Sequence, residues 1–311
     1  MTKRGRSVTV LSMERFNPLN DYLFLKIMGE KGDEPQCLAF LNAVLADANQ
    51  NPIKLIQILE NRILTPEILG DKTSILDLHV LDENGGKYEI EVQLKDLRNM
   101  EKRTLYYWAQ EYSRSISAGV DYAALPRVIT INIVNFDNIK IERYHTAFHI
   151  CEDRQKDYLL TDVLEIHFLN MVKFRKLKSR ERERGALYRW LAYFDVQTSA
   201  EELEEVLRMD VGIQKAEERL RFVTQDKDFL REYHIRQMEM SDWTTGINTA
   251  FEKGVKKGIE KGIEKGIEKG GYAKSVDIAK KALAKGFPLE VIEELTGLKA
   301  EDIVPLREGD A

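Results

Sequence analysis

Apolar residues recur every three or four positions over residues 20–28 and 35–46, at the start of the chain. This spacing predicts two helices, and Pro35 suits the first turn of the second one. From residue 53 onward the period falls to two, which is typical of strands with one buried face. The three strands that this pattern predicts are 53–59, 74–82 and 87–95.

The last two of these strands are separated by the turn sequence Glu83-Asn84-Gly85-Gly86. Because Asn and Gly tolerate the positive φ angles of a tight turn, we expect the two strands to pair antiparallel as a hairpin. Side chains along each strand then alternate between the two faces of the sheet.

A helix and a strand are expected after the hairpin. Residues 100–118 carry an apolar stripe at helical spacing, which predicts that this stripe packs against the core. Residues 127–135 are a run of β-branched side chains, which favours a strand that is buried on both faces. The stripe of the helix consists of Leu105, Trp108, Ala109, Tyr112 and Ile116.

The pattern weakens beyond residue 136, although strands remain expected over 144–150 and 164–171, and helices over 181–194 and 200–239. Together these elements predict an α/β fold whose core has the order αβββαβ. We place this core at residues 14–195, followed by a helical linker at 196–251 and a C-terminal helical region at 252–311.

The C-terminal region opens with a tetrapeptide repeat of Gly, Ile, Glu and Lys over residues 252–270. Each interior Gly costs about 1 kcal/mol relative to Ala, so an isolated helix here is marginal. The segment therefore either packs on a partner or is a flexible spacer, and we expect copies of the chain to associate through its Ile stripe. Short helices over 273–285, 288–295 and 300–306 resemble a helix-turn-helix unit that binds DNA or a second copy.

Candidate chemistry lies on the predicted hairpin. Period-two alternation puts Asp77 on the polar face of its strand, and it puts Glu91, Gln93 and Lys95 on the polar face of the next. Two carboxylates and a backbone carbonyl, such as that of Val92, form a hard-oxygen site that Mg²⁺ prefers. From the spacing alone, a solvated polar face explains the same pattern.

Several segments in order along the chain resemble the Rpn family, the PD-(D/E)XK nucleases also described as transposases. The resemblance covers residues 14–195, and the repeat tail is also similar to those of family members. The segments that carry it, besides the Asp77 strand, are FNPLNDYLF at 16–24, LNAVL at 41–45, EVQ at 91–93 and KRTLYY at 102–107.

The resemblance implies a PD-(D/E)XK core, DNA cleavage that depends on a divalent metal, and a role in recombination or gene transfer. It implies that Asp77 and Glu91 are the metal-binding acids, with Asp21 as a further acid on the first helix. Gln93 takes the place that Lys holds in the motif name. Glutamine supplies hydrogen bonds but no charge, so Lys95 is the candidate for the missing cation.

Two groups of side chains are candidates for DNA contact, and for both the alternative is an ordinary solvated face. Helical spacing places Arg103, Tyr107 and Gln110 on one face of the helix that follows the hairpin. The second group lies in the basic run at 173–184 and comprises Lys173, Arg175 and Lys176. His79 shares the predicted face of Asp77 and is a further candidate site residue. The other histidines fall in no metal-ligand spacing, so we expect ordinary polar roles for His145, His149, His167 and His234.

Composition limits the function further. The formal net charge of −5 argues against coating of nucleic acid by bulk charge, but it leaves local basic patches open. Apolar runs are too short to span a membrane, and the N-terminus lacks the apolar core of a signal peptide, so a cytoplasmic protein is expected. The rival to a nuclease is a catalytically degenerate nuclease fold that binds DNA or protein; strand transfer has the least support.

Overall fold

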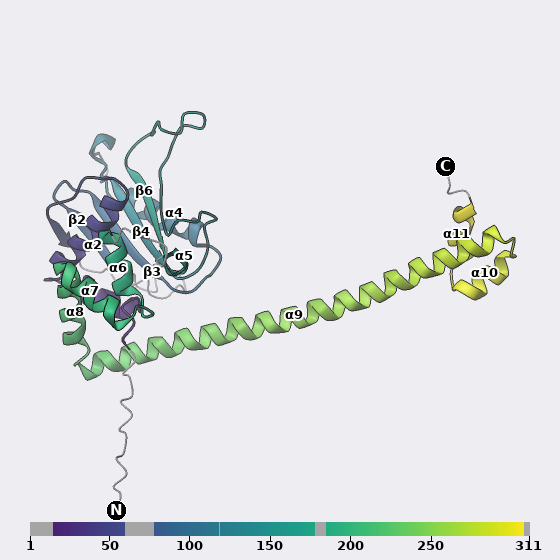
Figure 1. The fold of residues 1–311 in the computed structure, drawn as a ribbon. Coiled ribbons are helices and arrows are strands. Elements are labelled where there is room, and N and C mark those ends of the chain that lie inside the picture. Colours follow the sequence, from purple (N-terminus) through teal and green to yellow (C-terminus); the bar gives the residue numbers. More distant parts are fainter. Residues whose placement is uncertain (1–14, 60–77, 118, 178–184, 308–311) are drawn as a thin grey trace, which may run out of the picture. The chain divides into compact units, whose positions relative to one another are not determined.

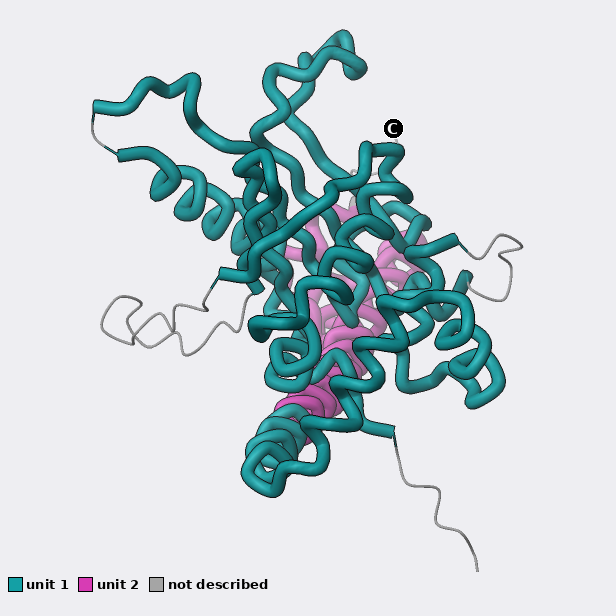
Figure 2. Tube along the Cα trace, turned by 90° about the vertical axis from the view of Figure 1, so that its left-hand side faces the viewer, with its two compact units in different colours: residues 1–240 teal, residues 241–311 magenta. Residues whose placement is uncertain are grey.

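The computed structural model describes residues 15–59, 78–117, 119–177 and 185–307. The chain divides into two compact units, residues 1–240 and 241–311 (Figure 2). The first unit contains the sheet, and the second contains most of a long helix and a small helical cluster. Residues 196–240, expected as a linker, belong to the first unit.

The first unit is built on a six-stranded mixed sheet in the order β1-β2-β3-β4-β6-β5 (Figure 1). β1, β2 and β3 pair antiparallel, β3, β4 and β6 pair parallel, and β5 pairs antiparallel to β6. This confirms the α/β fold with its PD-(D/E)XK core order. The strands are β1 (Ile56–Ile58), β2 (Leu78–Asp82), β3 (Lys87–Gln93), β4 (Val128–Val134), β5 (His145–Phe148) and β6 (Leu164–Asn170).

The turn between β2 and β3 forms the expected hairpin. The backbone N–H of Asp82 donates to the Gly86 carbonyl at 2.9 Å, and the Asp82 carboxylate accepts from the N–H groups of Asn84 and Gly86, each at 2.8 Å. Gly85 adopts a φ of +83°, which a residue with a Cβ rarely adopts. The register of the hairpin places Leu78 opposite Ile90.

One face of the sheet is covered by helices from both ends of this unit. An aromatic cluster joins them, with ring centroids 5.6 Å apart for Phe40 and Trp190 and 5.4 Å apart for Phe40 and Phe194. Val206 and Ile213 are buried in the same core, so α7 and α8 complete the domain and are not a linker. The helices are α1 (Asp21–Met28), α2 (Glu34–Asp47), α6 (Ala186–Phe194), α7 (Ala200–Met209) and α8 (Val211–Val223).

The other face of the sheet is covered by α4 (Met100–Arg114), which packs on β4. The prediction of its packed stripe was partly wrong: Trp108 donates its indole N–H to the Val128 carbonyl at 3.0 Å, but Leu105 is 48% exposed. The helix instead buries Met100 and Thr104. β4 presents polar side chains on this face, so the hydroxyl of Thr104 fits there better than an apolar residue does.

The remaining helices are α5 (Met171–Leu177), α9 (Lys227–Ala284), α10 (Leu289–Thr296) and α11 (Ala300–Ile303), with 3₁₀ turns η1 (Tyr122–Ala124) and η2 (Val304–Arg307). The stretch predicted as one helix over 200–239 is divided because Asp210 caps α8, accepting from the Gly212 N–H at 2.9 Å. The repeat is helical within α9. Two of the predicted short C-terminal helices are confirmed as α10 and α11, whereas the one predicted over 273–285 is the end of the continuous α9. The three elements share a small core of Ala279, Ile292 and Ile303.

In the described part of the chain, no helix combines the length and apolar character that a membrane span requires.

A buried polar chain crosses β5 and β6 on the face that α2 covers. His145 lies between the Asp47 carboxylate, 2.5 Å from its Nδ1, and His167, 2.8 Å from its Nε2. His167 Nε2 in turn lies 2.7 Å from Glu165, which also pairs with Arg127. The expectation of ordinary polar roles for these histidines missed this gathering, because strand pairing between distant segments creates it.

We expect acid to weaken the fold through this chain. Burial lowers the pKa of His167 below its usual 6.5, although the Glu165 carboxylate opposes the shift. A group with a lowered pKa in the fold stabilises it above the unfolded pKa, and this stabilisation is lost as the pH falls. The melting temperature should therefore fall from pH 7 to pH 5, and less steeply for His167→Gln. His234→Gln, at an exposed histidine, is the control; an unchanged slope in His167→Gln would contradict this account.

Gly212 tests the close packing of α8 on α2. A Cβ at this position would lie 2.4 Å from the Ala39 Cβ and 3.1 Å from Trp190. Gly212→Ala should therefore lower the free energy of unfolding of this unit by about 1–3 kcal/mol, as overpacked cores do. Gly271→Ala meets nothing within 4 Å and should leave that unfolding unchanged in urea melts. Equal stability of the two variants would show that α8 is not packed this closely.

Candidate active site

The β3 strand separates polar from apolar side chains across the sheet. Ile90 and Tyr88 enter the core under α1 and α2, whereas Glu89 and Glu91 face the side that α4 covers. Glu91 is only 5% exposed. A carboxylate this deeply buried is costly unless an opposite charge or hydrogen bonds compensate it.

Six polar and aromatic side chains line a small pocket between β3, β4 and α4. The described side chains pack so closely here that no water molecule fits between them. The register of the parallel pair places Glu89 opposite Thr130 and Glu91 opposite Asn132. The lining residues are Glu89, Glu91, Thr104, Tyr107, Thr130 and Asn132.

Hydrogen bonds fix the floor of this pocket. The side-chain amide of Asn132 donates to the Thr104 hydroxyl at 3.1 Å and to the His167 backbone carbonyl at 3.0 Å. The hydroxyls of Thr104 and Thr130 lie 3.4 Å apart. Sequence reasoning did not select these residues, although polar Thr130 and Asn132 alternate with Ile in a strand that is otherwise apolar.

Arg103 supplies the charge that compensates Glu91. Its Nη2 lies 2.6 Å from Oε1 of Glu91, and its guanidinium lies 5.5 Å from the centroid of the Tyr107 ring. Burial raises the pKa of Glu91, while the positive charge of Arg103 opposes that shift. Arg103 and Tyr107 of α4, which were expected to contact DNA phosphate, therefore lie beside the Glu91 carboxylate. Gln110 lies further along the helix and donates to the Tyr106 hydroxyl at 2.7 Å.

Gln93 is the last residue of β3, two positions after Glu91, and Lys95 lies just beyond the strand. The Gln93 amide donates to the Lys95 backbone carbonyl at 2.8 Å, and both side chains are half-buried. This bond holds the carboxamide at the end of the strand, two residues from Glu91. Val92, whose backbone carbonyl is a candidate metal ligand, lies between Glu91 and Gln93.

Asp77, the other candidate acid, lies outside the described residues. Within the described residues, no three His, Cys, Asp or Glu side chains gather in a metal-binding arrangement. The chemistry of the donors nevertheless suits a hard divalent cation, because Glu89 and Glu91 present carboxylates to one pocket. Further oxygen ligands would have to come from outside the described residues, from backbone carbonyls or from water.

Asp21 is placed at the first turn of α1, where its carboxylate pairs with Arg236 at 3.0 Å. It also accepts from the Tyr22 N–H at 2.8 Å. Its partners lie on helices: Tyr22 on α1 itself and Arg236 on α9. The structure thus assigns this acid a local contact that joins α1 to the start of α9.

The three basic candidates on α5 differ in exposure. Lys173 is 5% exposed, and its ammonium contacts the Ile139 and Ile141 carbonyls and the Asp137 carboxylate. Its charge is thus used to hold the loop after β4, which argues against a role in DNA contact. Arg175 likewise pairs with the buried Asp195 at 2.9 Å. Lys176 is exposed and remains available to phosphate.

Comparison with known proteins agrees with this arrangement. The sequence matches the family described as PD-(D/E)XK nuclease family transposase over residues 18–250. No curated protein and no solved structure matched the chain. The match includes β3, α4 and β4, which line the pocket, and also the helices α7 and α8 that complete the domain. On this match the chain belongs to the PD-(D/E)XK nuclease family of transposases.

Proposed function

We propose that this protein is a metal-dependent DNA endonuclease that hydrolyses phosphodiester bonds through Glu91 and Asp77. The observation that carries the proposal is a carboxylate buried to 5% exposure on the polar face of β3, inside a fold of a nuclease family. Buried acids with shifted pKa values in polar pockets are typical of functional sites.

Strand register supports Asp77 as the partner of Glu91. Leu78 lies opposite Ile90 in the hairpin. In the sequence, Asp77 directly precedes Leu78 and alternates with apolar positions, as Glu91 does in β3. The ligands we propose are the Asp77 and Glu91 carboxylates and the Val92 carbonyl. Asp21 is the weakest candidate, since its carboxylate already pairs with Arg236.

A divalent ion, Mg²⁺ by the chemistry of these donors, would lower the pKa of a bound water and neutralise charge on the scissile phosphate. The protein's own groups orient the reaction. Glu91 would exchange its ion pair with Arg103 for the cation, which releases the guanidinium to hold the phosphate. Gln93 orients water by hydrogen bonds, and Lys95 supplies positive charge.

DNA is the substrate we propose, and cleavage of it would promote recombination or gene transfer. Basic and polar side chains of α4, which are half-buried, and the exposed Lys176 of α5 would contact the phosphates, which fix orientation without reading sequence. The residues proposed for this contact are Arg103, Tyr107, Gln110 and Lys176.

A second candidate function is binding without cleavage. It is favoured by the ion pair between Arg103 and Glu91, which occupies the carboxylate, and by Gln93 at the position of the motif lysine. If that ion pair is permanent, the pocket is a structural element, and the fold serves as a module for DNA or protein recognition.

Cleavage of supercoiled plasmid decides between the two. With Mg²⁺ the wild-type chain should nick the plasmid, and Glu91→Gln and Asp77→Asn should each reduce the rate by at least about a hundredfold, because each removes a charged ligand. Glu101→Gln, at an exposed acid on α4, is the matched control and should retain activity. DNA binding without nicking by the wild-type chain would favour the second function.

Variants of Arg103 separate catalysis from folding. Arg103→Lys keeps the charge but loses the forked geometry, so it should retain more cleavage than Arg103→Met, which leaves Glu91 buried without its partner. Removing one partner of a buried pair costs about 3–5 kcal/mol, so Arg103→Met should also melt at a lower temperature. Mg²⁺ should restore part of that lost stability. Equal stability of wild type and Arg103→Met would show that the ion pair does not hold the pocket.

A further inference from the structure

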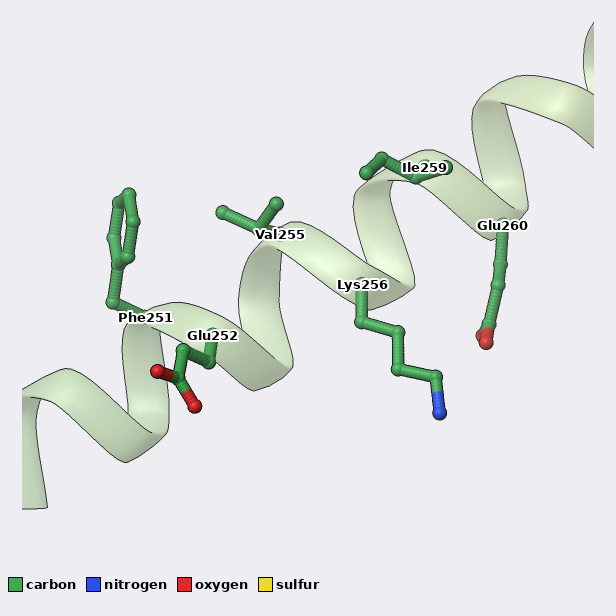
Figure 3. Close-up of a pocket in the computed structure, with 6 residues that line it drawn as sticks. All are labelled: Phe251, Glu252, Val255, Lys256, Ile259 and Glu260. Atoms are coloured by element: carbon green, nitrogen blue, oxygen red, sulfur yellow. The ribbon is translucent and has the colours of Figure 1, made fainter.

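The repeat segment of α9, residues 246–271, carries a continuous row of exposed apolar side chains that we term the apolar ridge. Its members are spaced four residues apart and are between 45% and 71% exposed. Figure 3 shows Phe251, Val255 and Ile259 on one side of the helix, with Lys256 and Glu260 on the other. Surface of this kind on a lone helix indicates a binding partner. The ridge consists of Ile247, Phe251, Val255, Ile259, Ile263 and Ile267.

Beside the ridge runs a row of small residues that we term the glycine groove. One small residue precedes each member of the ridge, so the two rows have the same spacing. A Cβ added at any of the glycines would meet nothing within 4 Å, so another helix can approach the backbone closely. The groove consists of Gly246, Ala250, Gly254, Gly258, Gly262, Gly266 and Gly270.

The two rows fit each other. Side-chain rows at i±4 on one helix pack between the i±4 rows of another when the axes cross at about −50°. A repeat longer than 3.6 residues also wraps the contact surface in the right-handed sense. The ridge of one chain therefore fits the groove of an identical chain. At the same crossing angle, the ridge of the second chain fits the groove of the first. This self-complementarity favours a second copy as the occupant.

Charge sets the direction of the pair. One flank of the ridge and groove carries glutamates, and the other carries lysines. In a parallel two-fold pair, the lysine flank of each copy lies against the glutamate flank of the other, whereas an antiparallel pair brings like charges together. The glutamate flank comprises Glu252, Glu260, Glu264 and Glu268, with Lys256 as its one departure; the lysine flank comprises Lys253, Lys257, Lys261, Lys265 and Lys269.

We propose that the repeat segment of α9 binds the same segment of a second copy in parallel, with the apolar ridge of each copy seated in the glycine groove of the other. Parallel pairing places the N-terminal ends of both α9 helices at the same end of the pair. Each of these ends begins within a nuclease unit, at Lys227. One consequence rests on the proposed nuclease function: a paired protein can cut both strands of one duplex.

The oligomeric state of the full chain tests this proposal without DNA or metal, so its failure is distinct from failure of the nuclease. Sedimentation equilibrium should show a dimer. Ile259→Gln with Ile263→Gln should raise the dissociation constant by about tenfold or more. Ile278→Gln, at an isoleucine of α9 that is 38% exposed and outside the ridge, is the matched control and should leave association unchanged.

Gly258→Leu with Gly262→Leu fills the groove and keeps the ridge. Leu favours the helix more than Gly does, so the helix content measured by circular dichroism should stay equal or rise while the dimer dissociates. Loss of association in this variant cannot then be attributed to unfolding. A wild-type chain that is monomeric at every concentration, or a dimer that survives both double variants, would overturn the proposal.

Crosslinking tests the direction. In a Cys151→Ser background, where the remaining Cys37 is buried, Val255→Cys and Ile263→Cys are made separately. With a short thiol crosslinker, each variant alone should form covalent dimers in a parallel pair. Dimers that form only when the two variants are mixed would establish an antiparallel pair and overturn the assigned direction. In plasmid cleavage, the dissociated variants should still nick but should yield less linear product than wild type.

Discussion

The ion pair between Glu91 and Arg103 is the interaction on which the rest of the site depends. A carboxylate exposed to 7% of its side-chain surface is expensive to ionise, and the guanidinium at 2.6 Å offsets that cost. Arg103 itself is held by the ring of Tyr107 and by the helix that carries it. The charge on β3 and the position of α4 therefore determine one another, because neither side chain is well compensated without the other.

This constraint explains why the two faces of the sheet differ. Toward α1, α2 and α6 the strands present Ile and Tyr to an aromatic core, as packing energy requires. Toward α4 the same strands present Glu89, Glu91 and Asn132, and the Thr104 hydroxyl of α4 accepts a hydrogen bond from the Asn132 amide. A polar layer of this kind stabilises little by burial of apolar surface, but it supplies the charged and hydrogen-bonding groups that the proposed function uses. Beside it, Met100 of α4, Val134 of β4 and Phe168 of β6 form a separate apolar cluster.

Much of this arrangement could be predicted from local pattern. Alternation along 87–95 and the Asn84-Gly85 turn are local signals, and the β3 strand, its hairpin and the placement of Glu91 on the polar face follow from them. The buried edge of α4 could not be predicted in the same way. Thr104 is buried and Leu105 is exposed because Thr104 contacts the polar side chains of Thr130 and Asn132 on β4, which lie far from it in the sequence. The basic run misled for a similar reason: Lys173 reads as a surface charge until the loop carbonyls of Ile139 and Ile141 close around it. The hydrogen-bonded series of Asp47, His145 and His167 joins segments that only the tertiary fold brings together. Its members therefore have no characteristic spacing in the sequence.

The central claim is that Glu91 exchanges Arg103 for a divalent cation, and direct metal binding tests it without reference to cleavage. Mn²⁺ titrated into the full chain and followed by electron paramagnetic resonance reports free and bound ion. The account predicts binding by the wild-type chain, loss of that binding in Glu91→Gln, and retention in Glu101→Gln. Absence of binding by the wild-type chain, or equal binding by Glu91→Gln, would contradict it and leave the ion pair as a structural contact alone.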